Sequence, residues 1–117
     1  MEFKADRPIY TQIALCVKEW ILNGKYSIGE KLPSVREFTL LFEVSALTIQ
    51  RAIANLESDG VIISKKGIGS FVSQDCKKSL EHEMVVEQTR EYIQKMKNLG
   101  MGKEHIKYLV GEELEHE

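Results

Sequence analysis

The sequence gathers hydrogen-bonding side chains in one short stretch, SALTIQR, which begins at Ser45. Gln50 can make paired hydrogen bonds to the edge of an adenine, and Arg51 can bind guanine or a phosphate. Ser45 and Thr48 can donate hydrogen bonds to phosphate oxygens, while Ala46 can contact a thymine methyl group. These residue types predict contact with double-stranded DNA, provided that one structural element presents them together.

Two further groups of residues could share that surface. Ser34 and Arg36 carry a hydroxyl and a guanidinium group, and the run Lys65-Lys66-Gly67 joins two cations to a glycine. Adjacent lysines supply local positive potential, and a glycine lets backbone amides approach phosphates or the minor groove closely. Taken singly, Ser45 is equally well explained as a helix cap, and Gln50 and Arg51 as solvated side chains. Their joint occurrence favours a DNA-binding surface.

Three helices are expected to position these residues. Apolar residues recur at three- and four-residue steps over residues 9–23, which predicts a helix that stops at Gly24. The apolar face of this helix consists of Tyr10, Ile13, Ala14, Val17 and Ile21. Ser34 and Glu37 have the spacing of a capping box, so a second helix should begin at Ser34 and run to about Phe42.

The third helix should begin at Ser45, a second N-cap residue, and end at Gly60. Its apolar stripe consists of Ile49, Ala52, Ile53 and Leu56. Two capped helices separated by a tight turn have the spacing of a helix-turn-helix. The helix that begins at Ser45 would then be the one that carries the stretch SALTIQR.

A β-hairpin should follow the helices. Residues 61–64 and 70–73 are rich in β-forming side chains and flank the glycine-containing segment 65–69, which predicts two strands with a basic tip. Three helices and such a hairpin make a winged helix-turn-helix, in which the third helix enters the major groove and the wing lies along the neighbouring groove. The expected fold class is therefore mainly α with a small β-hairpin (α+β), followed by a two-helix C-terminal tail.

Five short motifs follow one another between residues 8 and 72. With x for any residue, they are PIYxQI from Pro8, GxxLPSxR from Gly29, VSxxTIxRA from Val44, LExxG from Leu56 and GxGxFV from Gly67. These motifs resemble the DNA-binding domain of GntR-family transcriptional regulators. The resemblance implies that Arg36, Gly67 and the residues at 46 and 50 lie at the DNA contact surface.

The sequence departs from the common pattern of that family at three positions. Ala46 and Gln50 stand where many members have arginine, so contacts to A·T base pairs become more plausible than guanine readout. Glu43 replaces a frequent glycine in the turn between the second and third helices, which allows a different turn conformation. The expected DNA-contact residues remain Ser34, Arg36, Ser45, Ala46, Thr48, Gln50, Arg51, Lys65, Lys66 and Gly67.

The C-terminal part carries a different pattern. Apolar side chains over residues 79–99 recur at alternating four- and three-residue steps, a seam suited to pairing with another helix. The predicted dimerisation seam consists of Val85, Thr89, Tyr92, Ile93, Met96 and Leu99. A shorter helix over residues 103–114 should follow, with Ile106, Leu109 and Val110 on its apolar face. Both helices could instead only cover the N-terminal core.

Dimerisation is the better use of these residues, because two short helices leave little room for a ligand pocket, which commonly occupies about 300 Å³ or more. The short tail is similar to that of the YtrA-type subfamily of GntR regulators, and this resemblance implies a homodimer without a large effector domain. Genes for ABC transporters are frequent targets of that subfamily. In a dimeric repressor, two recognition helices related by a two-fold axis would meet a near-palindromic operator.

Length and charge agree with this division of the chain. The 117 residues allow one small domain with an appendage, and the net charge of −2 disfavours a broadly basic, nonspecific polyanion binder. Residues 1–74 hold nine Lys and Arg against eight Asp and Glu, whereas residues 75–117 hold seven against ten. We therefore expect a winged helix-turn-helix DNA-binding domain over 1–74 and a short helical dimerisation region over 75–117.

Other classes of function find little support. Cys16 and Cys76 form no CxxC motif and are expected to be ordinary thiols, and a metal site between His82 and Glu87 is a weak alternative. No catalytic triad, phosphate-binding glycine loop or zinc-protease motif is present, so we expect neither an enzyme nor a cofactor. No apolar run is long enough to span a membrane and no secretory signal opens the chain, which predicts a cytoplasmic protein.

Two alternatives to a DNA-binding regulator stay open at this point. The near-neutral charge of the N-terminal part is compatible with a winged-helix module that binds another protein and not DNA. A small-effector sensor is the other alternative, and it would use Tyr92, Met96 and His105 as its pocket.

Overall fold

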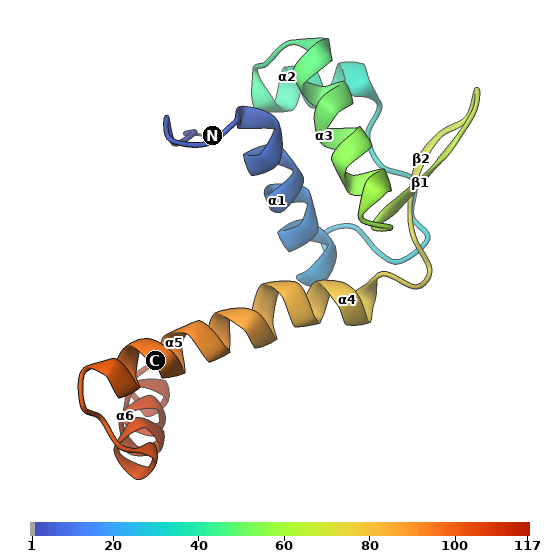
Figure 1. Cartoon of the computed structure of the whole chain (residues 1–117). Helices are drawn as coiled ribbons and strands as arrows, with labels where there is room; N and C mark the ends of the chain where they lie inside the picture. Colours follow the sequence, from blue (N-terminus) through green and yellow to red (C-terminus); the bar gives the residue numbers. More distant parts are fainter. Residues whose placement is uncertain (1) are drawn as a thin grey trace. The chain divides into compact units, whose positions relative to one another are not determined.

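The computed structural model describes residues 2–117 as two compact units. The first unit ends at Glu81 and contains three helices, a β-hairpin and the short helix α4, whereas the second spans His82–Glu117 and is helical (Figure 1). No helix among residues 2–117 combines the length and apolar character needed to cross a membrane.

The three helices of the first unit are α1 (Ile9–Leu22), α2 (Val35–Phe42) and α3 (Ala46–Ser58). Both predicted N-caps are confirmed. Ser34 and Glu37 form the capping box, in which each accepts a hydrogen bond from the other's backbone N–H at 3.1 Å. Ser45 Oγ accepts from the Thr48 N–H at 3.2 Å and so caps α3. The sequence therefore sets the start of both helices of the helix-turn-helix through local hydrogen bonds.

The wing consists of β1 (Ile62–Lys65) and β2 (Gly69–Val72), which pair antiparallel with Lys65 opposite Gly69. Each strand differs by one residue from the prediction at 61–64 and 70–73. The segment before α2 adds a third edge that the sequence did not indicate, because Leu32 N–H donates to Ser70 O at 2.8 Å. This pairing fixes the root of the wing against the connection into α2.

The core of the first unit lies between α1 and α3. Ile13 and Val17 of α1 are buried with Ile49 and Leu56 of α3, and Phe38 of α2 closes this core. Burial of such side chains from all three helices supplies the main stabilisation of a small domain. One face of each helix is thereby used for packing, and the other faces remain available for contacts outside the unit.

A polar contact also ties α1 to the end of α3. Lys18, buried in α1, forms an ion pair at 2.9 Å with Asp59, the residue that follows the last turn of α3. Trp20 stacks on Phe42 at 5.6 Å and meets Tyr26 edge-on at 5.9 Å, so α1 is also joined to the end of α2. These contacts join α1 to the ends of both α2 and α3.

The first unit extends past the expected boundary at residue 74. Cys76 and Leu80 are both buried in the core of that unit, and Leu80 belongs to the short helix α4 (Lys77–Glu81). Residues 74–79 are mostly polar, so their composition gives no signal that part of this stretch joins the core. The packing of Cys76 and Leu80 instead places the division of the chain at Glu81.

The second unit contains η1 (His82–Val86), α5 (Glu87–Asn98) and α6 (Lys103–Glu115). We expected one regular helix over 79–99, but η1 is a π-helical turn, whose i→i+5 hydrogen bonds shift the positions that follow it. Val85 therefore lies in the π-helical turn, outside the α-helix that holds Thr89, Tyr92, Ile93 and Met96. The predicted end of the helix at Gly100 is confirmed, and this glycine has a φ of 88°.

Candidate nucleic-acid interface

Helix α3 has one buried side and one exposed side. Ile49, Ala52 and Leu56 point into the core, while Gln50 and Arg51 are exposed. The helical repeat places the exposed pair away from the buried stripe. An amide and a guanidinium therefore stand on the outer side of a helix whose position is fixed by packing, which is the requirement for contact with base edges or phosphates.

The first turn of α3 is held by the two hydroxyl side chains predicted to contact phosphate. Ser45 Oγ accepts from the Thr48 N–H, and the two hydroxyl oxygens lie 3.0 Å apart. Their mutual hydrogen bond uses one hydroxyl proton, so the other remains available for an outside acceptor. Ser45 and Ala46 are exposed, and Thr48 is half-buried.

The first turn of α2 presents Arg36, which is exposed. The capping box at Ser34 fixes the start of this turn, so the Ser34 hydroxyl has a structural role beside its predicted contact with DNA. The hydrogen bonds that the Glu37 carboxylate accepts from Ser34 hold the pKa of Glu37 below its ordinary value. Glu37 is therefore ionised at neutral pH. Its carboxylate accepts the hydrogen bond of the cap and follows Arg36 directly in the chain.

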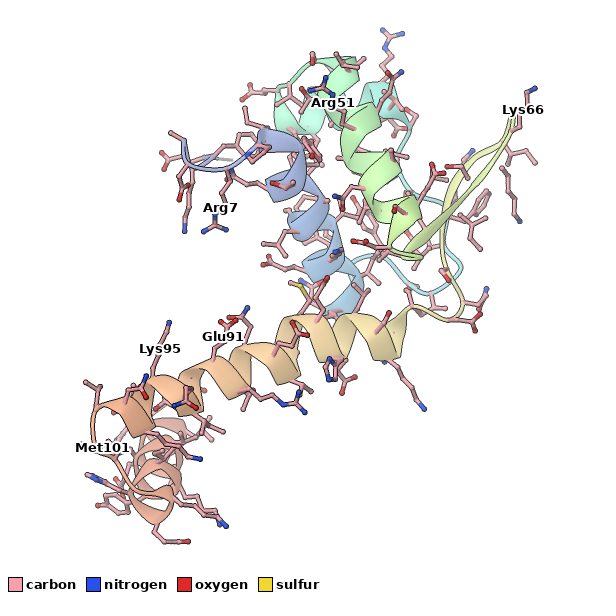
Figure 2. The ribbon with its side chains drawn as sticks, in the orientation of Figure 1. Arg7, Arg51, Lys66, Glu91, Lys95 and Met101 are labelled. Atoms are coloured by element: carbon pink, nitrogen blue, oxygen red, sulfur yellow. The ribbon has the colours of Figure 1, made fainter. Side chains whose placement is uncertain are left out.

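The wing presents Lys66 at the tip of the hairpin (Figure 2). Lys65, Lys66 and Gly67 are all exposed, and Gly67 has a φ of 76° with open space around it. The Lys65 amine lies 4.7 Å from the centre of the Phe71 ring, and Ile68 N–H donates to Lys65 O at 2.9 Å. The tip is thus a closed turn with free backbone on one side, as phosphate or minor-groove contact requires.

Lys31 is a cation that the sequence analysis missed. It is exposed, and its Cε would lie 2.9 Å from a Cβ built on Gly69, so the Lys31 side chain runs directly along the wing. The pairing of residues 30–32 with β2 brings it there. A single lysine in a turn-rich segment carries no local signal of that pairing, and only the fold adds it to the wing lysines.

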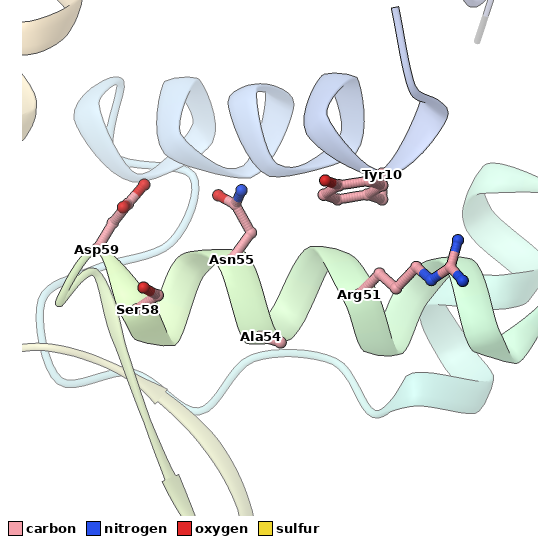
Figure 3. A pocket seen from close by; sticks show the side chains of 6 residues that line it. All are labelled: Tyr10, Arg51, Ala54, Asn55, Ser58 and Asp59. Carbon is pink, nitrogen blue, oxygen red and sulfur yellow. The ribbon is translucent and has the colours of Figure 1, made fainter.

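A groove of about 490 Å³ runs between α1 and α3 (Figure 3). Its walls consist of Tyr10, Arg51, Ala54, Asn55, Ser58 and Asp59. The Tyr10 hydroxyl, the Arg51 guanidinium and the Asn55 amide are hydrogen-bond donors, whereas the Asp59 carboxylate is paired with Lys18 at 2.9 Å. The three donors of the groove suit an anionic oxygen such as that of a phosphate.

Tyr10 and Asn55 line this groove although the sequence does not indicate them as site residues. Tyr10 belongs to the predicted apolar face of the first helix, and Asn55 carries no signal of its own. The predicted contact residues come from α2, α3 and the wing of the first unit, and all except the half-buried Thr48 are exposed. Their contact with DNA stays a prediction.

A second exposed surface belongs to the second unit. Tyr92 and Val85 are exposed, Leu99 is 70% exposed, and Ile93 and Met96 are half-buried. Thr89 is exposed as well, and its hydroxyl donates to Val85 O at 2.8 Å. Apolar side chains left open to water in this way mark a surface that can be covered by a partner.

The same unit holds the His82–Glu87 pair considered as a metal site. His82 Nδ1 lies 3.7 Å from Glu87 Oε1. Among residues 2–117, no group of three or more His, Cys, Asp or Glu side chains is arranged to hold a metal ion. The pair is therefore described as a surface ion pair that depends on protonation of the histidine.

Comparison with known proteins identifies the family. Residues 9–72 match the family described as bacterial regulatory proteins, gntR family. The chain belongs to the GntR family. The matched segment covers α1, α2, α3 and both strands of the wing. It therefore includes every predicted DNA-contact residue.

Individual relatives of this GntR-family chain cover most of its length. The HTH-type transcriptional repressor YtrA of Bacillus subtilis is 34% identical over 77% of this chain and 72% of its own. A GntR family transcriptional regulator from Listeria monocytogenes has a similar solved structure, with a TM-score of 0.87, 37% identity and coverage of 94% of this chain and 98% of that chain.

One similar structure contains DNA. AraR(DBD) in complex with operator ORR3 is 37% identical, with a TM-score of 0.56, and the match covers 62% of this chain and 86% of that chain. The winged helix-turn-helix assignment is thereby confirmed. The relatives named here are transcriptional regulators, and this GntR-family chain has the DNA-binding fold that such regulators use.

Proposed function

We propose that this GntR-family protein is a homodimeric repressor that binds a near-palindromic DNA operator. The observation that carries the proposal is the exposed side of α3, where Gln50 and Arg51 stand opposite the buried stripe. Arg36 on α2 and the wing residues Lys65 and Lys66 add cations from neighbouring elements of the same unit. These cations supply the local positive potential that a chain of net charge −2 otherwise lacks.

The dimeric state is proposed from the second unit. Its exposed apolar side chains, among them Tyr92 and Leu99, favour burial against a second copy of the chain. A two-fold axis through that contact relates the two first units, so the two α3 helices would meet half-sites of opposite orientation. Near-palindromic symmetry of the operator follows from the symmetry of the protein.

The repressor role and the regulated genes are proposed from similarity. YtrA of Bacillus subtilis is named a transcriptional repressor, and the short tail of this chain resembles the subfamily that YtrA typifies. A transporter operon, and in particular the operon that holds the regulator's own gene, is the proposed target. Binding of chromosomal DNA in a bacterium would take place in the cytoplasm.

DNA binding is tested with the full chain and duplexes from its own promoter region. We expect submicromolar binding to a near-palindrome and a steep loss of affinity between low and physiological salt, because phosphate contacts release counterions. The double variant with Arg36→Ala and Lys66→Ala should lose this binding. A double variant with Lys103→Ala and Lys107→Ala removes the same charge from exposed positions of α6 and should keep it.

Two outcomes would contradict the proposal. Equal, weak binding of specific and scrambled duplexes at moderate salt would exclude a sequence-specific regulator. Failure to bind any duplex, in a chain that is folded by circular dichroism, would favour the alternative of a winged-helix module for a protein partner. Repression itself is tested with a reporter gene under the bound promoter, and an increase in reporter signal with the regulator present would indicate activation instead.

A further inference from the structure

The outer side of α3 carries an apolar side chain that the proposed polar contacts do not use. Leu47, in the first turn of α3, is 58% exposed. The core contacts of α3 are made by Ile49, Ala52 and Leu56, so Leu47 is not needed for packing of the unit. An exposed leucine needs no special explanation by itself. The position of Leu47 on α3, however, relates it to the proposed base contacts.

Leu47 stands on the same side of α3 as the proposed base contacts. It precedes Gln50 by three residues and Arg51 by four, and side chains at these separations are neighbours on one side of a helix. The hydroxyl groups of Ser45 and Thr48 in the same turn hydrogen-bond to each other, which leaves one hydroxyl proton for a phosphate. The exposed apolar groups that this turn offers are the side chains of Leu47 and Ala46.

The major groove has one apolar group that such a side chain can contact. Among the four bases, only thymine carries a methyl group, at C5, on its major-groove edge. Leucine brings a branched aliphatic group further from the helix axis than alanine does. We propose that Leu47 contacts a thymine methyl group in each half-site and thereby helps to determine which DNA sequence the protein binds. This inference rests on the proposed DNA-binding function.

The size of the effect can be set from the burial of one methyl group. Transfer of one such group out of water favours binding by a factor of about four in affinity. Replacement of a single thymidine by 2′-deoxyuridine removes only this methyl group and keeps every hydrogen-bonding atom of the base. The expected loss at the contacted position is therefore about fourfold.

The experiment begins with duplexes that the wild-type full chain selects from a random-sequence library. Each thymidine of the selected half-site is replaced in turn by deoxyuridine, and affinities are measured by fluorescence anisotropy for the wild type and for Leu47→Ala. We expect the wild type to lose about fourfold at one thymine of the half-site. Leu47→Ala should bind the thymine and uracil duplexes equally well, because the side chain that contacts the methyl group is gone. The double-mutant cycle of protein and DNA changes measures the coupling between Leu47 and that methyl group.

Leu41→Ala serves as the matched control. Leu41 lies on α2 and is 51% exposed, so its truncation removes the same atoms from a comparable surface position outside α3. This variant should keep the wild-type discrimination between thymine and uracil. Fluorescence of Trp20, the one tryptophan of the sequence, reports whether each variant is folded.

Distinct results overturn the inference and the function on which it rests. If the wild type binds every deoxyuridine duplex as tightly as the parent, or if Leu47→Ala keeps the loss at the same thymine, the contact is absent although DNA binding stands. If the selection yields no preferred sequence, the proposed function fails, and the inference about Leu47 fails with it.

Discussion

At the scale of single residues, Glu43 shows how a departure from a family pattern is accommodated. It ends α2 in the left-handed region, with φ 55° and ψ 49°, and among residues 2–117 it is the only non-glycine residue with positive φ. The frequent glycine at this position has no Cβ and adopts this conformation without strain. Glu43 therefore holds the turn of the helix-turn-helix in a conformation that glycine adopts more easily, at a conformational cost.

Glu43→Gly should stabilise the protein by about 0.5–1 kcal/mol, because relief of the left-handed strain exceeds the greater entropy of glycine in the unfolded chain. The free energy of unfolding is measured in urea with Trp20 fluorescence as the probe. Glu19→Gly, at an exposed position inside α1, is the control and should destabilise by about 1 kcal/mol. A lower urea midpoint for Glu43→Gly would contradict the prediction.

The capping box gives stability a dependence on pH. The hydrogen bonds from Ser34 lower the pKa of Glu37 in the folded protein below its ordinary value of 4.5. A lowered folded pKa means that the stabilisation is fully present above the unfolded pKa and is lost as the pH falls through the folded pKa. We expect the stability advantage of the wild type over Glu37→Gln to shrink as the pH is lowered from about 6 to about 3.

The measurement is a series of urea unfolding curves for both proteins over that pH range. Glutamine can still accept the hydrogen bond from the Ser34 N–H, so both proteins keep the geometry of the cap and differ in the ionisable group. Other carboxylates titrate equally in both and cancel in the difference. A difference in stability that stays constant with pH would show that the charge of Glu37 does not contribute.

At the scale of elements, the sequence predicts what depends on local interactions. The starts of α2 and α3 follow from Ser34 and Ser45, because a cap is a hydrogen bond between residues three apart in the chain. Gly100 ends α5 for an equally local reason, since glycine adopts a positive φ without strain. The helix-turn-helix and the wing were therefore predictable, to within one residue at each strand.

Features that depend on contacts between distant residues were not predictable. Lys31 joins the wing only because its segment pairs with β2, and Tyr10 meets Arg51 only through the packing of α1 on α3. The burial of Leu80 in the core, which moves the boundary to Glu81, is of the same kind. The π-helical turn η1 interrupts an apolar repeat that by itself favoured a regular helix.

Gln50 and Arg51, two of the exposed polar residues of α3, should make two different kinds of contact with DNA. Arg51 lines the groove with Tyr10 and Asn55, a donor-rich site for a phosphate oxygen, whereas Gln50 lies outside that groove. Arg51→Ala should weaken binding about equally across sequences and reduce the slope of log affinity against log salt by about 1. Gln50→Ala should instead relax the preference at one base pair, which costs the cognate site about 1–3 kcal/mol.

The comparison requires binding isotherms for cognate and single-mismatch duplexes at several salt concentrations. Wild type and both variants are measured with the same duplex set. If Arg51→Ala changes the base preference and leaves the salt slope unchanged, Arg51 reads a base and the groove is not a phosphate site. If Gln50→Ala behaves as described for Arg51, the assignment of the two residues is reversed.

At the scale of the whole molecule, the two units divide the proposed work. The first holds the family-matched fold, and the second holds exposed apolar residues that a partner could cover. Leu99→Asp places a charge in the predicted dimerisation seam, where burial of an unpaired carboxylate is costly. We expect the wild type to sediment as a dimer and Leu99→Asp as a monomer. Leu40→Asp, at a 73% exposed position of α2, is the matched control and should remain dimeric.

Loss of the dimer should affect DNA binding in a specific way. In a dimer, when one protomer binds its half-site, the DNA-binding unit of the other protomer is held close to the second half-site. Such coupling typically increases affinity by about 10²–10⁴. Leu99→Asp should therefore bind a duplex with a single half-site as the wild type does, yet gain nothing from the full palindrome. Anisotropy titrations with both duplexes measure this difference. A monomer cannot occupy both half-sites at once. If the wild type and Leu99→Asp gain equally in affinity from the full palindrome, the second unit does not link the two DNA-binding units.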